Sequence, residues 1–123
     1  MSRMSIGSLT SLLKALPKSM SVKVFTNDLG YTDKIYVWEE GHDYRHFIEL
    51  MYNRWDNKPK SFIVEDLLSD LNKCYKNKSN NYRNDIYINV DAPPKYRSST
   101  SVIDATVKNG VLYLKGNKPS WIK

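Results

Sequence analysis

Three Tyr-Arg pairs are the residues of this sequence whose types best suit ligand chemistry. They are Tyr44-Arg45, Tyr82-Arg83 and Tyr96-Arg97. Four hydroxyl residues, 98–101, follow the third pair. An arginine guanidinium binds phosphate through two parallel hydrogen bonds, a tyrosine ring stacks on a nucleobase, and hydroxyls bind the remaining phosphate oxygens. Together these groups predict a nucleotide pocket.

We predict that this ligand-binding site contains the three pairs, the histidine after the first pair and one of the serines. Its residues are Tyr44, Arg45, His46, Tyr82, Arg83, Tyr96, Arg97 and Ser99. The alternative is structural, in that each arginine caps a backbone carbonyl or pairs with Asp43, Asp85 or Asp91. Both interpretations stay open on the sequence.

Signatures of catalysis and of metal binding are weak. His42 and His46 are four residues apart, a spacing that puts two imidazoles on one face of a helix, but no further ligands follow at a recognisable spacing. No nucleophile elbow or paired-carboxylate motif occurs, and the five glycines are not clustered into a phosphate loop. The sequence therefore predicts a protein that is not an enzyme and that holds neither a metal nor a cofactor.

The composition favours a folded domain with an anionic partner. The chain has 123 residues, 41% hydrophobic and 26% charged, and we predict a single domain over residues 1–123. Its net charge of +6 attracts phosphates, which excludes a protein that acts by imitating DNA. The basic residues of the C-terminal half would also suit a nucleic-acid backbone.

The chain shows no sign of secretion or of membrane insertion. Its only cysteine, Cys74, cannot form an internal disulfide and lies in an apolar helical pattern, where a packed side chain is expected. No N-terminal apolar run is long enough for a signal peptide or a membrane span. These features predict a cytoplasmic protein without membrane contact.

The elements expected to position these residues make an α+β fold. Apolar spacing predicts helices over residues 5–16 and 62–76, the second with Ser61 as its N-cap. Alternation predicts strands over 22–26, 34–40 and 85–90. Asn109-Gly110, between the alternating segments 102–108 and 111–115, predicts a C-terminal β-hairpin with a type I′ turn. We therefore expect a small, mainly antiparallel sheet with two or three packed helices.

Two segments carry weaker signals. In residues 44–55 the apolar positions fit a helical face, yet Ile48, Leu50 and Tyr52 also alternate as in a strand, and both readings stay open. Residues 77–81 are polar and are expected to form a loop.

The order of these patterns resembles a family of small, mostly uncharacterised bacteriophage accessory proteins. The family has a first helix that ends in Leu-Pro, which matches Leu12, Leu13, Leu16 and Pro17, and a Tyr-Arg-Gly segment, which matches residues 43–46. Its second helix matches Leu67, Leu68 and Leu71, and its Tyr-Lys-Gly-Gly segment matches residues 82–85. Its last hairpin matches residues 103–114. It covers most of the chain, although His46 and Asn84-Asp85 replace the glycines of the family. The resemblance implies a phage protein used against host defence, and no defined reaction.

Charge, the Tyr-Arg pairs and this resemblance together predict a phage anti-defence protein of the host cytoplasm that binds and sequesters an anionic nucleotide, such as a second messenger. A homo-oligomer would enclose the ligand between subunits. One alternative is a direct inhibitor of a host defence protein, acting through a patch around Trp38, Trp55 or Trp121. Others are an enzyme that cleaves a nucleotide signal with His42 or His46, and a nucleic-acid binder.

Overall fold

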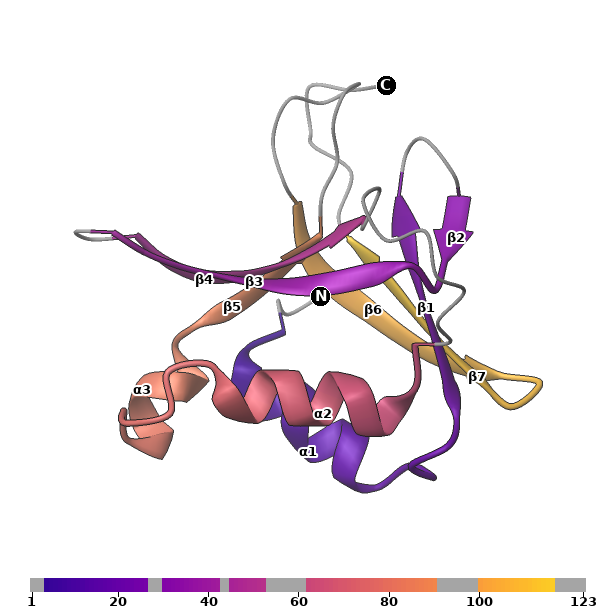
Figure 1. Ribbon diagram of the computed structural model, residues 1–123, viewed down its shortest axis with the longest axis horizontal. Helices are drawn as coiled ribbons and strands as arrows, with labels where there is room; N and C mark the ends of the chain where they lie inside the picture. The colour runs from indigo at the N-terminus through magenta and orange to yellow at the C-terminus, as the bar shows by residue number, and fades with distance from the viewer. Residues whose placement is uncertain (1–3, 27–29, 43–44, 53–61, 91–99, 117–123) are drawn as a thin grey trace.

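A computed structural model gives the fold of this chain and describes residues 4–26, 30–42, 45–52, 62–90 and 100–116 (Figure 1). The helices are α1 (Ile6–Lys14), α2 (Val64–Lys73) and α3 (Asn80–Asn84). The strands are β1 (Ser21–Thr26), β2 (Gly30–Thr32), β3 (Ile35–His42), β4 (Arg45–Tyr52), β5 (Tyr87–Val90), β6 (Thr100–Lys108) and β7 (Val111–Gly116). Four of the six described strand pairs are antiparallel, which confirms the α+β class and the mainly antiparallel sheet.

The strands follow the order β2-β1-β7-β6-β5-β4-β3, and β6 joins the two halves of the sheet. Its first residues pair with β5, and from Val102 onwards it pairs with β7, with a register shift between Val102 and Asp104. Where β5 and β6 diverge, the backbone of Met4 bridges them: its N–H donates to the Val102 carbonyl at 2.9 Å, and its carbonyl accepts from the Ile88 N–H at 2.8 Å. The N-terminal segment thereby fills the opening in the sheet.

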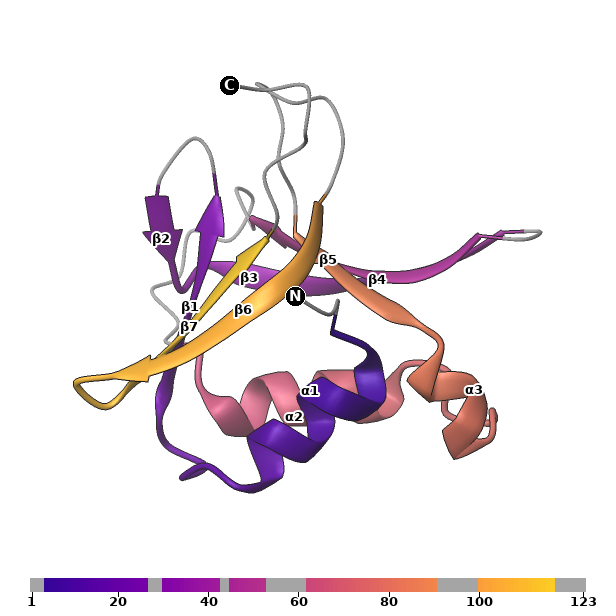
Figure 2. The same cartoon turned by 180° about the vertical axis from the view of Figure 1, so that it is seen from behind.

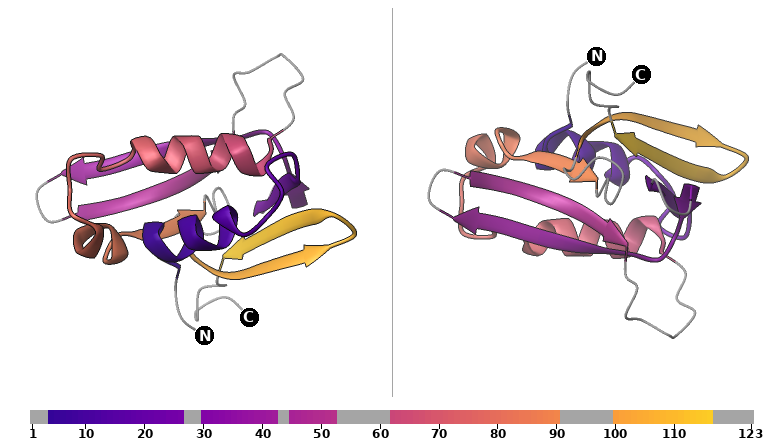
Figure 3. Two further views of the ribbon diagram at one scale, coloured as in Figure 1. Left: turned by 90° about the horizontal axis from the view of Figure 1, so that it is seen from below. Right: turned by 90° about the horizontal axis from the view of Figure 1, so that it is seen from above.

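The described helices cover one face of the sheet (Figures 2 and 3). Every second strand residue faces them, as the two-residue repeat of a strand requires. These strand residues are Val22, Val24, Ile35, Ile48, Leu50, Ile88, Val90, Val102, Leu112 and Leu114, and all are buried. They meet the apolar faces of α1 and α2 in one hydrophobic core.

A local turn signal decides the hairpin at the middle of the sheet, whereas β4, next to its edge, is decided by pairing with its neighbours. The last two strands form the predicted hairpin, and its turn residues Asn109 (φ 54°) and Gly110 (φ 75°) both have positive φ, as a type I′ turn requires. Residues 45–52 of the ambiguous stretch form the strand β4, with Ile48 and Leu50 buried against the helices, and the rest of the stretch lies outside the described residues. Pairing with β3 and with β5 therefore decides between the two periodicities of this stretch.

Two predictions about the helices are wrong. The N-cap of α2 is Ile63, with no side-chain cap, and the predicted cap Ser61 lies outside the described residues. The first N–H groups of α2 donate instead to the carbonyls of Met20, at 2.9 Å, and Lys18, at 3.0 Å, in the segment after α1. The expected loop over residues 77–81 runs into α3, because the Ser79 hydroxyl caps a single helical turn.

Candidate functional site

A polar stripe on α1 forms one wall of the candidate site. The helix begins with a capping box, in which the Ser5 N–H donates to Ser8 Oγ at 2.8 Å and the Ser8 N–H donates to Ser5 Oγ at 3.1 Å. Beyond it, polar or small residues recur at helical spacing, at Gly7, Thr10, Ser11 and Lys14. The apolar residues of α1 contact the core, so this stripe is left to line the space between the helices.

The other walls come from α2 and α3. Asn72 lies in the last turn of α2, while Arg83 and Asn84 lie in α3. α3 approaches α1 closely at Gly7, where a Cβ would overlap the Asn84 side chain. Glycine at this position therefore allows the two helices to meet.

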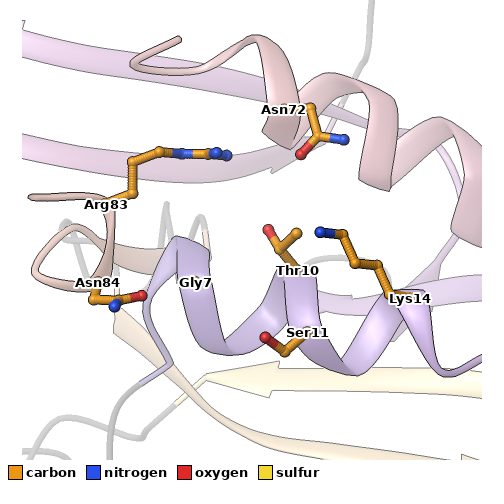
Figure 4. A pocket seen from close by; sticks show the side chains of 7 residues that line it. All are labelled: Gly7, Thr10, Ser11, Lys14, Asn72, Arg83 and Asn84. Carbon is orange, nitrogen blue, oxygen red and sulfur yellow. The ribbon is translucent and has the colours of Figure 1, made fainter. Parts of the chain in front are cut away.

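These residues enclose a cavity of about 280 Å³, here called the helix cleft. It is lined by Gly7, Thr10, Ser11, Lys14, Asn72, Arg83 and Asn84 (Figure 4). Figure 4 shows Arg83 reaching from α3 towards α2, and Lys14 turned along α1 towards Thr10. Two of the seven lining residues are cationic and none is acidic, so the helix cleft favours an anion.

Two buried atoms in the wall of the helix cleft have no hydrogen-bond partner in the described part of the chain. They are Thr10 Oγ1 and Arg83 Nε, and no other buried side-chain nitrogen or oxygen of that part is in this state. Thr10 is only 8% exposed. An unpaired buried polar atom costs about 1–3 kcal/mol, so native proteins keep few of them. Both atoms belong to residues that line the helix cleft, so a small rotation of these two side chains would turn the atoms towards a polar ligand there.

Arg83 also has a structural role. Its Nη2 donates to the Leu71 carbonyl at 2.9 Å, at the C-terminal end of α2. This contact confirms, for one N–H group, the alternative that a Tyr-Arg arginine caps a carbonyl. The guanidinium has five N–H donors, so donors remain for a ligand.

Tyr82, the neighbour of Arg83, does not line the helix cleft. Its ring packs edge-on against Tyr75, with the ring centroids 5.9 Å apart, and Lys78 Nζ lies 5.3 Å from its centroid. The structure therefore separates the two members of this pair: Arg83 faces the cleft and Tyr82 packs beside it.

The other residues of the predicted site are not tested by the structure. Tyr44, Tyr96, Arg97 and Ser99 lie outside the described residues. The backbones of Arg45 and His46 belong to β4, but their side chains are outside the described part. A site that joins the three pairs thus stays a prediction.

Cys74 is confirmed as a packed side chain. It is buried, and its Sγ donates to the Asp70 carbonyl at 3.3 Å. Burial, with smaller contributions from Glu39 and Asp70, raises the pKa of this thiol to about 11, so it is protonated at neutral pH. Among the described side chains, no group of three or more His, Cys, Asp or Glu could hold a metal ion, and those of His42 and His46 are outside that set.

Sequence reasoning missed most of the helix cleft. Thr10, Lys14 and Asn72 were not among the predicted ligand-binding residues. The spacing of Gly7, Thr10, Ser11 and Lys14 was a usable signal, because a polar stripe beside the apolar face of a helix marks a surface that the core does not cover.

Comparison with models of known protein families, with curated proteins and with solved structures found no match for this chain. The likeness to phage accessory proteins therefore stays a prediction. In the described ranges, no helix has the length and apolar character needed to cross a membrane.

Proposed function

We propose that this protein binds a phosphate-bearing small molecule, most concretely a nucleotide, in the helix cleft and does not alter it chemically. The observation that carries this proposal is that Thr10 and Arg83, whose buried Oγ1 and Nε lack partners in the described part of the chain, line one cavity together with Lys14. All three residues can donate hydrogen bonds, and phosphate oxygens are acceptors.

The chemistry of the lining residues favours phosphate over other ligands. Lys14 and Arg83 supply positive charge, the Asn72 amide and the Ser11 hydroxyl supply further donors, and no described lining residue is a carboxylate that would repel an anion. A cation or an apolar ligand would gain little from these groups. The net charge of +6 adds long-range attraction for anions.

The size of the helix cleft limits how much of a nucleotide it encloses. Its volume of about 280 Å³ is below the usual range of roughly 300–1,000 Å³ for small-molecule sites. We therefore expect the phosphate end to enter the cleft and the base to extend over the exposed side chains of Asn72 and Lys14.

Sequestration follows from the residues that line the helix cleft. None of the seven described residues is His, Cys, Asp or Glu, the side chains that most often serve as general acid or base. The resemblance to phage accessory proteins would make the ligand a host defence signal and the protein its sponge in the host cytoplasm. A second subunit could then enclose the exposed base.

Isothermal titration with a panel of cyclic and linear nucleotides, and with inorganic phosphate, tests the proposal. We expect one or more nucleotides to bind, to be displaced by excess phosphate and to be recovered intact by mass spectrometry. The variant Lys14→Ala should weaken binding, while Lys76→Ala, the same change at an exposed position outside the cleft, should not. Absence of heat with every ligand, or equal effects of the two variants, would overturn the proposal.

Direct inhibition of a host protein is the second candidate, and Trp38 favours it. This tryptophan is 48% exposed on β3, which is an edge strand of the described sheet. Large aromatic residues are common at the centres of protein interfaces. Under this candidate, Trp38→Ala would abolish inhibition of the target enzyme, and Lys14→Ala would leave it intact. Trp55 and Trp121 lie outside the described residues.

A further inference from the structure

The face of β1 and β7 that is turned away from the helices carries a second group of side chains suited to ligand binding. Val22, Val24, Leu112 and Leu114 are buried under the helices. Because strand side chains alternate, the residues between and beside them lie on the opposite face. These are Lys23, Phe25, Tyr113 and Lys115, and Tyr31 of β2 joins them because it pairs with Phe25.

Three of these side chains form an aromatic row, Phe25, Tyr31 and Tyr113. The ring centroids of Phe25 and Tyr31 are 5.3 Å apart, and those of Tyr31 and Tyr113 are 5.0 Å apart, both pairs edge to face. Tyr31, in the middle, is 41% exposed. At one end, Lys115 Nζ lies over the Phe25 ring, 5.1 Å from its centroid. Aromatic surface and positive charge thus lie side by side.

A shallow groove of about 430 Å³ adjoins the aromatic row. It is lined by Tyr31, Asp104, Thr106, Lys108, Asn109 and Tyr113. The groove extends onto the β6–β7 hairpin, whose tip extends past the described helices (Figure 3). The helices therefore leave this side of the hairpin uncovered.

The charge around the row favours a polyanion. Lys23 pairs with Tyr113 in the strand register, Lys108 lines the groove, and Lys115 lies over Phe25. Among the described residues, three cations thus adjoin the row against one carboxylate, Asp104, which stands opposite Lys115. The opposing carboxylate, Asp104, accepts a hydrogen bond from Thr106 Oγ1 at 3.1 Å. Burial, then Asp104 and Tyr113, raise the pKa of Tyr31, so this phenol carries no charge at neutral pH that would repel phosphate.

We propose that the aromatic row and its groove bind a single-stranded nucleic acid, with bases against the tyrosine rings and phosphates beside the lysines. Unpaired bases expose faces that stack on aromatic side chains, whereas a duplex hides them. An open groove with lysines on several sides suits a chain of nucleotides better than one enclosed molecule. This site is separate from the helix cleft, which lies on the other side of the sheet.

Fluorescence anisotropy with labelled oligothymidine and oligouridine tests the proposal on the full chain. We expect binding of one or both strands, with an affinity that falls steeply between about 50 and 200 mM salt. Tyr31→Ala should weaken binding about tenfold or more through lost stacking. Lys108→Ala should lower the slope of log affinity against log salt by about 0.7, the share of one phosphate contact on a single strand.

Three controls make the outcome decisive. Tyr31→Phe keeps the ring and should bind like the native protein, which separates stacking from a folding defect. Lys76→Ala makes the same charge change as Lys108→Ala on the helix side, and Lys14→Ala changes the helix cleft; both should retain binding. Asp104→Asn should strengthen binding. The proposal would be overturned if the protein bound neither strand at low salt, or if Lys76→Ala and Lys108→Ala lost binding equally. It would also be overturned if Lys14→Ala lost binding while Tyr31→Ala kept it in full.

Discussion

Thr10→Val should make this protein more stable and should weaken binding of the proposed ligand. Thr10 is 8% exposed in α1, and its Oγ1 is a buried atom with no partner in the described part of the chain. Valine has nearly the same shape and a similar helix propensity, so the substitution removes the hydroxyl with little effect on packing. The native hydroxyl is then a cost to the ligand-free fold, and the proposed ligand would offset that cost.

The size of the effect follows from the cost of an unpaired buried polar atom, about 1–3 kcal/mol. With an unfolding entropy of about 2.1 cal/mol/K per residue, the 123 residues give a shift of about 4 °C in Tm for each kcal/mol. Ligand-free Thr10→Val should therefore melt about 4–12 °C above the native protein. A lost hydrogen bond to a charged phosphate, about 1.5–3 kcal/mol, should weaken nucleotide binding about ten- to hundredfold.

Thermal unfolding by circular dichroism, with and without nucleotide, measures both effects. Thr106→Val is the control for a hydroxyl that has a partner, because Thr106 is exposed on β6 and its Oγ1 donates to Asp104; its Tm should not rise, and it should stay within about 2 °C of the native value. Thr10→Ser keeps the hydroxyl and should retain binding while losing stability. A Tm for Thr10→Val at or below that of the native protein would mean that the hydroxyl is satisfied in solution, and the reasoning would fail.

Three further predictions concern packing and pH. Gly7→Ala should raise the free energy of unfolding in urea by up to about 1 kcal/mol in the Asn84→Ala variant, because alanine favours a helix more than glycine does. In the native protein the gain should be smaller, because the added Cβ would overlap the Asn84 side chain. Equal gains in the two backgrounds would contradict this close approach. Cys74 should react with iodoacetamide at about pH 8 at least tenfold more slowly in the folded protein than in urea. Folding raises the pKa of this thiol from 9.0 to about 11. The contribution of the thiol to the free energy of unfolding is therefore complete below pH 9.0 and is lost as the pH rises through about 11. Cys74→Ala should remove that part of the pH dependence. Gly110→Ala should cost about 1 kcal/mol or more, because residue 110 has a φ of 75°, and no loss would contradict the type I′ turn.

The sequence predicted best those elements whose signals are local. Asn109-Gly110 defines its hairpin with two residues, and the alternation of residues 22–26 needs no distant partner. The start of α2 was missed because its capping carbonyls come from Lys18 and Met20, far away in the sequence. α3 was missed because five residues are too few for a periodic pattern.

The candidate site was predicted only at the residue whose chemistry is distinctive. Arg83 was chosen for its phosphate-binding guanidinium, and it does line the helix cleft. Thr10 and Asn72 are common residues that become informative only when the packing of three helices buries one hydroxyl and places the amide in the wall of the same cavity. Such pairings depend on tertiary contacts between α1, α2 and α3, which no local pattern records.

In the proposed function, Arg83 would link ligand binding to the stability of the helix layer. One N–H group caps α2 at Leu71, while Nε stays unpaired in the wall of the helix cleft. The same end of α2 is tied to the sheet, because the Tyr75 N–H donates to the Glu39 carboxylate of β3 at 3.2 Å. A ligand at a hundred times its Kd adds about 2.7 kcal/mol to the free energy of unfolding, which is comparable to the cost of about 1–3 kcal/mol for one unpaired buried atom. Under the proposed function, binding at this level would offset the cost of one such atom, and a ligand that pairs both Thr10 Oγ1 and Arg83 Nε would remove both costs. A small fold could then retain this polar cavity in its helix layer.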